Sequence, residues 1–479
     1  MQETLLKIVS TANSYISTYV LVILLVGIGI FYTIRTRFVQ VRCFGEGMKR
    51  VFGRNGKAGK GGLSSFQALT TAVAAQVGTG NIVGACGAIL IGGPGAIVWM
   101  WVIAFFGMAT IYAEATLAQQ TREVDADGTV HGGPVYYIKR AFRGGFGKFL
   151  AVFFGLAVII ALGFIGSMVQ SNSIAESING ITGDIGFNYN WIVGIVITVL
   201  AGFIFIGGVK RIGAVTEKMV PVMAVLYLLG GLFVICVNIT NLPAAIGSIF
   251  KYAFMPSAII GGGIGYALKE AISQGAKRGL FSNEAGMGST PHAHALADVE
   301  KPHDQGVAAM IGVFIDTFVV LTVTALVVII TLYCGDGPLA GAYDPSTVGT
   351  LFGIAKTNMA QLAFGDAFGT LFGASVGATI GNVFVAVCLF FFAFSTIISW
   401  NYFGKVNAEH LFGKKGVIVY SVISLVFIFL GTLTSNDLVW ELTDFVNYLM
   451  VFPNVLALLV LSGMVIECAK LKKKNNPLD

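Results

Sequence analysis

The sequence predicts an all-α polytopic membrane protein of about 11 transmembrane helices, an N-terminal helix followed by a 5+5 inverted repeat. The 479-residue chain is 56% hydrophobic and 11% charged, and its mean hydropathy is +0.81. It therefore has too little polar surface to cover a water-soluble domain of this size. Apolar stretches of about 20 residues, the length that crosses a bilayer core, recur from Tyr15 to Ile466, and two of them are interrupted by glycine-rich segments.

Hydropathy places the spans one after another with short polar connections. They are expected at 15–34, 64–92, 95–120, 148–173, 191–208, 216–239, 252–275, 306–333, 370–402, 416–433 and 440–467. The first span lacks a basic leader and a small-residue cleavage site, so we expect a retained helix rather than a signal peptide. The predicted segments are an N-terminal helix with a basic loop (1–62), two five-helix repeats (63–240 and 241–467) and a basic tail (468–479).

The basic residues alternate between connections, and this alternation predicts the orientation of the chain. Of the 30 Lys and Arg residues, 26 lie in every second connection, whereas the other connections hold acids such as Asp184 and Asp437. Positive charge is retained on the cytoplasmic side of a membrane. We therefore expect a multi-pass plasma-membrane protein with its N-terminus outside and its C-terminus in the cytoplasm.

Two spans carry glycine-rich interruptions near their middle. The second is interrupted at Gln76-Val77-Gly78-Thr79-Gly80-Asn81, and the seventh at Gly261-Gly262-Gly263-Ile264-Gly265. Each interior glycine costs a helix about 1 kcal/mol relative to alanine, and backbone groups freed in lipid need another partner. With the first helix set aside, each broken helix opens a set of five, as in an inverted repeat with a midplane binding site. The alternative is that the glycines only permit close helix crossings.

The first break offers backbone groups of both polarities. Amides at the start of a half-helix attract a carboxylate, and carbonyls at the end of the other half attract Na⁺ or an ammonium group. We assign the amides of Thr79, Gly80 and Asn81 to the carboxylate of a zwitterion. The carbonyls of Ala74 and Val77 are assigned to the cation.

Side chains from other spans complete the predicted site. Ser395 and Thr396 are adjacent hydroxyls in an apolar run, where they can finish the oxygen shell that a hard cation prefers or bond carbonyls of their own helix. Gln76, Phe164 and Gln170 are candidate lining residues for the same cavity. Glutamines in a span also serve as hydrogen-bonding links between helices.

Asp316 is a carboxylate inside the eighth span. Such a group is costly in a bilayer and is a functional candidate for ion coupling or gating. The structural alternative is a cap on a neighbouring broken helix. Glu114 and Glu270 lie nearer the ends of their spans, where we expect interfacial salt bridges.

No enzyme signature is complete. Gly78-Thr79-Gly80 lacks the third glycine of a dinucleotide fingerprint at the right spacing, and 373–377 matches GxSxG without a strand or a triad histidine. The five histidines are expected in cytoplasmic connections without metal-ligand spacing, and the six cysteines are scattered singly as packing residues. We therefore expect a protein that is not an enzyme, holds no cofactor and binds no nucleic acid; its partners are the lipid bilayer, a small molecule and an ion.

The segment 92–107, GGPGAIVWMWVIAFFG, resembles the signature of the alanine or glycine:cation symporter family, also called sodium:alanine symporters. Supporting segments are 78–81, 132–134 with two tyrosines after it, and 282–289. Val98 replaces the aromatic residue expected in the signature. The resemblance covers nearly the whole chain, and it implies a LeuT-like fold and Na⁺- or H⁺-coupled uptake of alanine or glycine across a prokaryotic plasma membrane.

The resemblance also implies positions for the substrate and the ion. It supports Thr79 and Gly80 for the substrate carboxylate and adds Gly263 and Ile264 on the substrate side of the seventh helix. The implied sodium ligands are Ala74, Val77, Ser395 and Thr396.

These observations lead to one hypothesis and three rivals. The hypothesis is sodium-coupled symport of a small neutral amino acid, alanine and/or glycine, into the cell by alternating access, with sodium as the co-transported ion. One rival is a proton-coupled carrier that uses Asp316. Another is an ion-conducting pore, although no ring of like charges or carbonyl filter is evident. The last, an intramembrane enzyme, needs a polar catalytic cluster that the spans lack.

Overall fold

The structure is a computed structural model that describes residues 2–53, 63–126, 128–182, 188–254, 263–340 and 353–470, with the backbone alone at 2, 17–19 and 263–267. Nearly all of this chain is helical. The first half contains α1 (Gln2–Tyr15), η1 (Ile16–Leu21), α2 (Val22–Arg35), α3 (Val39–Arg42), α4 (Phe44–Phe52), β1 (Leu63–Ser64), α5 (Ser65–Gln76), η2 (Gly80–Gly84), α6 (Ala85–Gly92), α7 (Ala96–Thr121), β2 (Glu123–Val124), β3 (Val130–His131), α8 (Pro134–Ala141), α9 (Gly144–Val158), η3 (Ile159–Gly166), α10 (Ser167–Thr182), α11 (Asn190–Ile206) and α12 (Gly208–Val237). The second half contains η4 (Ile239–Asn241), α13 (Leu242–Phe254), α14 (Gly263–Asn283), α15 (Pro291–His294), β4 (Ala297–Asp298), α16 (Pro302–Val313), η5 (Phe314–Leu321), α17 (Thr322–Val328), η6 (Ile329–Tyr333), α19 (Met359–Phe372), α20 (Ala374–Gly431), α21 (Asn436–Val460) and α22 (Ser462–Lys470).

Long apolar helices make this a multi-pass membrane protein. Among the described residues, six continuous helices are long and apolar enough to cross a bilayer, and a seventh span consists of α5 with η2–α6, bent by 46°. The six are Ala96–Thr121, Gly144–Thr182, Gly208–Val237, Pro302–Tyr333, Ala374–Gly431 and Asn436–Val460. Large apolar side chains on the outer helices, such as Val199 of α11 and Leu229 of α12, are exposed, as expected where lipid replaces water.

The structure bears on three of the predicted spans. The predicted ninth and tenth spans correspond to two helices that meet at a kink within α20, at Gly413, where φ is +70°. The predicted seventh span, 252–275, is divided: α13 ends at Phe254 and α14 begins at Gly263. Of the predicted glycine break, 263–265 form the start of α14, whereas Gly261 and Gly262 lie outside the described residues.

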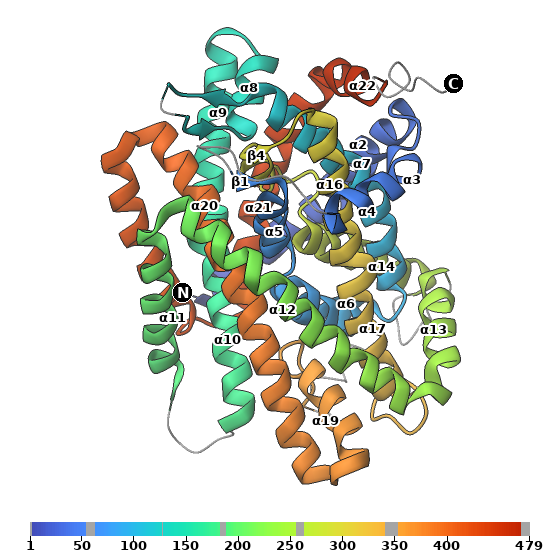
Figure 1. Ribbon diagram of the computed structural model, residues 1–479. Coiled ribbons are helices and arrows are strands. Elements are labelled where there is room, and N and C mark those ends of the chain that lie inside the picture. Colours follow the sequence, from blue (N-terminus) through green and yellow to red (C-terminus); the bar gives the residue numbers. More distant parts are fainter. Residues whose placement is uncertain are drawn as a thin grey trace.

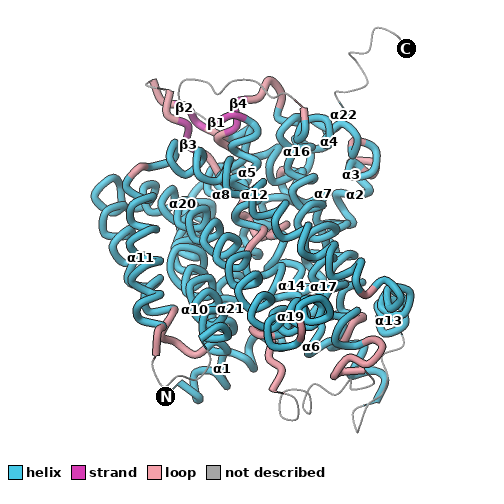
Figure 2. Tube along the Cα trace, turned by 60° about the horizontal axis from the view of Figure 1, so that its bottom comes forward, coloured by secondary structure: helices cyan, strands magenta, loops and turns pink. Residues whose placement is uncertain are grey.

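The bundle has two distinct ends. The short strands β1–β4, together with α4 and α22, lie at one end, which we call the strand end, whereas α13 and α19 lie at the other (Figures 1 and 2). Figure 2 places α1 and α22 at opposite ends of the bundle.

The start of α5 is fixed at the strand end by two local interactions. In a capping box, the Ser64 hydroxyl accepts the Gln67 amide at 3.1 Å and the Gln67 side chain accepts the Ser64 amide at 3.2 Å. Ser64 is also the last residue of β1, which pairs in parallel with β4 through Leu63–Ala297 and Ser64–Asp298. The strands thus join the start of the first broken helix to the segment that follows the second.

Candidate functional site at two helix breaks

The first break exchanges backbone hydrogen bonds for side-chain ones. The Gly78 amide donates to Asn81 Oδ1 at 3.0 Å, and the Thr79 amide donates to Gln170 Oε1 of α10 at 3.2 Å. In a continuous helix these amides would bond the carbonyls four residues earlier, those of Ala74 and Ala75. The break therefore leaves two carbonyl oxygens of α5 without their helical donors.

The freed carbonyls meet the two predicted hydroxyls of α20. Thr396 Oγ1 donates to the Ala74 carbonyl at 2.9 Å and lies 3.4 Å from that of Ala75. Ser395 Oγ lies 3.4 Å from the Ala74 carbonyl. Both hydroxyls also contact the Phe392 carbonyl of their own helix, at 2.9 and 3.1 Å. The expected juxtaposition of Ala74, Ser395 and Thr396 is therefore present, together with the own-helix bonds of the alternative interpretation.

Gly78 is required by this close approach. A Cβ at this position would overlap the Thr396 hydroxyl and lie 3.3 Å from Gln170 Oε1. A Cβ on Gly80 would lie 3.1 Å from both Phe281 and the backbone of Ser282. The glycines thus let the first break touch α20 on one side and the end of α14 on the other.

A second break, which was not predicted, follows α14. Helix α14 ends at Asn283, and Glu284, Gly286 and Gly288 then have positive φ of +58°, +90° and +80°. Glu284 is the unusual member because such a conformation is disfavoured with a side chain. The chain resumes as α15 at Pro291, so the break lies at the opposite end of α14 from Gly263 and Ile264.

Glu114 holds the second break in place. Its carboxylate accepts the amides of Gly286 and Gly288, each at 3.0 Å, and the Asn454 carboxamide at 2.6 Å. The side chain is fully buried. The predicted interfacial salt bridge is therefore wrong for Glu114, because the unwound segment supplies backbone donors to this carboxylate instead.

Asp316 of η5 connects the two breaks. Its carboxylate accepts the Asn81 carboxamide at 2.6 Å and the Ser282 hydroxyl at 2.9 and 3.1 Å. A second link is the Gln76 carboxamide, which donates to the Asn283 carbonyl at 2.8 Å. Asp316 therefore links the two broken helices through their side chains, and its role in coupling, gating or capping stays a prediction.

Three buried polar atoms beside the first break have no hydrogen-bond partner among the described residues. They are Gln76 Oε1, Thr79 Oγ1 and Gln170 Nε2. Unsatisfied buried polar atoms are rare because each one costs free energy. An acceptor, a hydroxyl and a donor together match the ammonium and carboxylate groups of a small zwitterion.

Aromatic side chains line the neighbourhood of the breaks. The Phe281 ring lies 4.8 Å from the Trp440 ring and 5.9 Å from the Trp400 ring. Trp400 Nε1 donates to Glu284 Oε1 at 2.5 Å, and the Ser289 hydroxyl donates to the other carboxylate oxygen. Phe281 and the two tryptophans are 4% exposed or less, so they limit the space beside Gly80.

An ion cluster lies nearly two helical turns, or about 6–7 residues, before the second break. Asp444 of α21 is 2.8 Å from Lys277 Nζ and 3.0 Å from Arg278 Nη2, and Glu441 is 3.1 Å from Lys277. Arg278 also lies 4.8 Å from the Trp440 ring. Both cations were expected in a connection, but α14 extends beyond its predicted end and places them inside the helix.

Other predicted residues lie elsewhere. The Phe164 ring stacks on Tyr420 and Phe427 of α20, in a cluster separate from the hydrogen bonds of the break. Gly263 and Ile264 are described only by their backbone, as the first two residues of α14. The histidines expected in connections are partly in helices: His292 and His294 in α15, His303 in α16 and His410 in α20.

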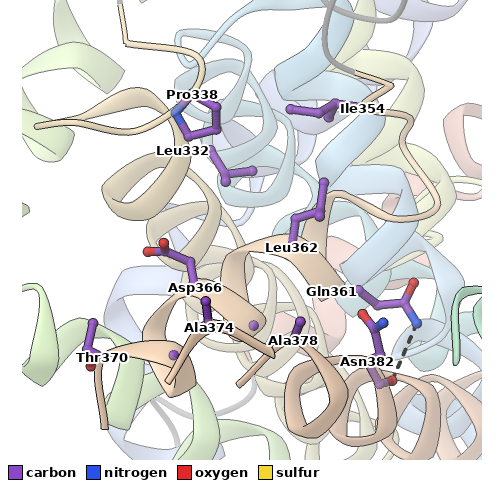
Figure 3. Close-up of a pocket in the computed structure, with 12 residues that line it drawn as sticks. Leu332, Pro338, Ile354, Gln361, Leu362, Asp366, Thr370, Ala374, Ala378 and Asn382 are labelled. Atoms are coloured by element: carbon purple, nitrogen blue, oxygen red, sulfur yellow. Dashed lines mark hydrogen bonds between the residues drawn. The ribbon is translucent and has the colours of Figure 1, made fainter. Parts of the chain in front are cut away.

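Ser282, Glu284 and Trp400 are site residues that the sequence pattern did not indicate. Segment 282–289 was recognised only as a family motif. Its two glycines and its buried acid next to an asparagine are a break signal, weaker than the consecutive glycines at 261–263. A separate cavity of about 650 Å³ lies between η6, α19 and the start of α20, where Gln361 donates to the Asn382 carbonyl at 3.4 Å (Figure 3); no residue of either break lines it.

The chain is similar to known transporters along nearly its whole length. The family model described as the sodium:alanine symporter family matches residues 2–476. The sodium/alanine symporter AgcS of Methanococcus maripaludis is 39% identical over 97% of this chain and 96% of its own. The putative sodium/proton-dependent alanine carrier protein YrbD of Bacillus subtilis is 39% identical over 95% of this chain and 90% of its own.

A solved structure shows the fold. The crystal structure of MhsT in complex with L-phenylalanine matches with a TM-score of 0.61 and 16% identity, covering 85% of this chain and 90% of that one. This match confirms the LeuT-like fold. The family model and the two relatives show that the chain belongs to the sodium:alanine symporter family.

Proposed function

We propose that this protein couples the inward movement of Na⁺ to the uptake of a small neutral amino acid, alanine and/or glycine, by alternating access. The observation that carries the proposal is the first break. Its freed carbonyls face two hydroxyls, and polar atoms without a hydrogen-bond partner lie beside it. Na⁺ binds the carbonyls of Ala74 and Val77 with the hydroxyls of Ser395 and Thr396. Family membership supports both the ion and the substrate class.

The substrate occupies the opposite side of the same break. Its carboxylate binds Thr79, Gly80 and Asn81, and it replaces Gln170 Oε1 as the acceptor of the Thr79 amide. The Thr79 hydroxyl and Gln170 Nε2 are added donors, and the ammonium group binds Gln76 Oε1. The unsatisfied state of these three side-chain atoms supports the assignment. The buried wall of Phe281, Trp400 and Trp440 supports a short side chain on the substrate.

The two breaks form the midplane of an inverted repeat, and Asp316 acts as the pivot between them. The N-terminus lies outside and the C-terminus in the cytoplasm, which agrees with the opposite placement of α1 and α22 (Figure 2) and with the basic connections. One Na⁺ moving down a potential of 100 mV supplies about 2.3 kcal/mol. That is roughly a fifty-fold concentration ratio for the amino acid.

A proton-coupled carrier is the second candidate. It is favoured by the buried carboxylates Glu114, Glu284 and Asp316 around the second break and by the YrbD relative, a putative sodium/proton-dependent alanine carrier protein. In this alternative Asp316 exchanges a proton in place of, or beside, bound Na⁺.

Uptake into proteoliposomes tests the proposal. Purified protein is reconstituted, and radiolabelled alanine uptake is measured with an inward gradient of either Na⁺ or H⁺, in the wild type and in Thr79→Val and Ser395→Ala. We expect concentrative uptake with Na⁺ alone, lost or strongly reduced in both variants. Uptake driven by H⁺ alone would favour the second candidate, and no uptake from correctly folded protein would refute the amino-acid carrier.

A further inference from the structure

Three side chains with metal-binding atoms meet at the strand end, outside the two helix breaks. Cys43 immediately precedes α4, Glu46 lies in the first turn of α4, and His303 is the second residue of α16. A thiol sulfur, a carboxylate oxygen and an imidazole nitrogen from these residues all lie within 4.8 Å of one another. We propose that Cys43, Glu46 and His303 bind a transition-metal ion of the Zn²⁺ class.

The donor set selects this class of ion. Zn²⁺ is bound by thiolate, imidazole and carboxylate, commonly with three protein ligands and a water molecule. Mg²⁺ and Ca²⁺ prefer oxygen ligands alone. A mixed sulfur, nitrogen and oxygen set therefore points away from these hard ions and from the Na⁺ assigned to the first break.

The imidazole of His303 is oriented for this role. Its Nδ1 is 2.6 Å from the hydroxyl of Tyr112, a buried residue of α7, and its Nε2 is 3.5 Å from Glu46 Oε2. When Nδ1 carries the proton and donates it to the Tyr112 oxygen, Nε2 presents a lone pair toward Glu46. A hydrogen bond on the far nitrogen is the usual way in which a metal-binding histidine is held.

Burial and exposure are distributed as an accessible metal site requires. Cys43 is 1% exposed, and the side chains of His303 and Glu46 are 9% and 22% exposed. Two ligands are therefore shielded, and the carboxylate provides the path from solvent. The Arg50–Asp304 ion pair, at 2.7 Å, is a second link between α4 and α16, so these helices are already held in register.

A bound ion would fasten the N-terminal helices to the span that carries Asp316. Helix α16 runs directly into η5, where Asp316 contacts both breaks. Because Glu46 and Cys43 belong to the segment after the first span, the ion would cross-link two regions more than 250 residues apart in sequence. The site is distinct from the transport site and is tested by binding, independently of transport.

Co²⁺ is the spectroscopic probe for this site. The full-length protein in detergent carries Cys236→Ser, which removes an exposed cysteine, and is titrated with Co²⁺. We expect one Co²⁺ per chain, a thiolate-to-cobalt charge-transfer band, the intense visible bands of tetrahedral Co²⁺, and displacement by Zn²⁺. Cys43→Ser should abolish the charge-transfer band, His303→Gln should abolish tight binding, and His131→Gln, at an exposed histidine paired with Asp125, should change neither.

Two milder variants keep the test decisive if Cys43→Ser or His303→Gln fails to fold. Tyr112→Phe removes the hydroxyl that orients His303, and Glu46→Gln removes a ligand at a partly exposed position. Tyr112→Phe should weaken Co²⁺ binding by about 10–100-fold, as loss of an outer-shell partner does, and Glu46→Gln should weaken it at least as much. Both variants should keep the gel-filtration profile of the parent protein. The proposal would be overturned if the Cys236→Ser protein showed no charge-transfer band, or if both milder variants bound Co²⁺ as tightly as this parent protein.

Discussion

The carboxamide of Asn81 donates to the carboxylate of Asp316 at 2.6 Å and to the backbone carbonyl of the same residue at 3.1 Å. Asn81 also accepts the Gly78 amide at 3.0 Å. One side chain therefore caps the first broken helix and fixes it to η5. Ser282 of the second broken helix donates to the same carboxylate. A movement of either broken helix therefore changes a hydrogen bond to Asp316.

The variant Asp316→Asn replaces an acceptor oxygen with a donor and leaves at least one of Asn81, Ser282 and Thr317 facing a donor. A buried donor without a partner costs about 1–3 kcal/mol. We expect a lower thermal unfolding midpoint and at least a roughly tenfold loss of uptake. Asp366→Asn, at an exposed position of α19, is the control and should behave as wild type. Wild-type uptake by Asp316→Asn would contradict the role of pivot.

Gly78→Ala should abolish uptake although the change is small. The added Cβ overlaps the Thr396 hydroxyl, so α5 and α20 must separate at the freed carbonyls. Gly247→Ala in α13, where nothing lies within 4 Å of an added Cβ, is the matched control. Adding Thr396→Ala to Gly78→Ala should restore the thermal unfolding midpoint but not the response to Na⁺. A Gly78→Ala protein with normal Na⁺-driven uptake would refute the steric argument.

The two hydroxyls of α20 should contribute unequally to Na⁺ binding. Thr396 Oγ1 is 2.9 Å from the Ala74 carbonyl and Ser395 Oγ is 3.4 Å from it. Thr396→Ala should therefore raise the Na⁺ concentration for half-maximal uptake more than Ser395→Ala does, by roughly tenfold if about 1.4 kcal/mol is lost. Thr379→Ala, which removes a hydroxyl bonded to its own helix on an exposed face, should have no effect. If the Na⁺ concentration for half-maximal uptake were the same in all three variants, the proposal that Na⁺ binds at these hydroxyls would be contradicted.

Asp444 should contribute more to the thermal stability of the protein than its neighbour Glu441. The Asp444 side chain is 2% exposed and contacts two cations, whereas that of Glu441 is 21% exposed and contacts one. Removing one partner of a buried pair costs about 3–5 kcal/mol, and a pair with one partly exposed member, as at Glu441, costs less because solvent screens it. Thermal unfolding should show a large shift for Asp444→Asn and a small one for Glu441→Gln. Similar shifts would mean that burial does not control this cluster.

Phe281→Ala should widen the range of substrates. The Phe281 ring fills the space next to Gly80 and packs on two tryptophans. Competition of unlabelled amino acids against labelled alanine is the measurement. We expect larger side chains, such as those of methionine and leucine, to compete in the variant and not in the wild type. An unchanged competition profile would place the substrate side chain away from Phe281.

The sequence predicts the first break well and the second one poorly. At Gln76–Asn81 the glycines, the threonine and the asparagine act locally, since Asn81 caps Gly78 three residues away. The second break depends on long-range partners: Glu114 of α7 and Asn454 of α21 hold the amides and carbonyl of the unwound segment. These partners lie 172 and 168 residues from Gly286 in the sequence and leave no local pattern. The consecutive glycines at 261–263 were therefore the stronger signal.

The same reason explains the other differences. Ser395 and Thr396 were recognised because adjacent hydroxyls are conspicuous in an apolar run, whereas Phe164 was assigned by depth alone and its ring points to Tyr420 and Phe427. Depth along a helix does not determine the face that a side chain occupies. The metal-binding atoms of Cys43 and His303 likewise have no sequence spacing that joins them.

Equilibrium binding of radiolabelled alanine to the purified protein, measured as a function of Na⁺ concentration, tests the shared break most directly. If the ion organises the carbonyl side and the amino acid the amide side, each must raise the affinity of the other by the same factor. We predict that alanine affinity rises with Na⁺ in the wild type and loses this dependence in Thr396→Ala, with Thr379→Ala unchanged. Alanine binding that ignores Na⁺, or that keeps its full Na⁺ dependence in Thr396→Ala, would contradict a common site at the first helix break.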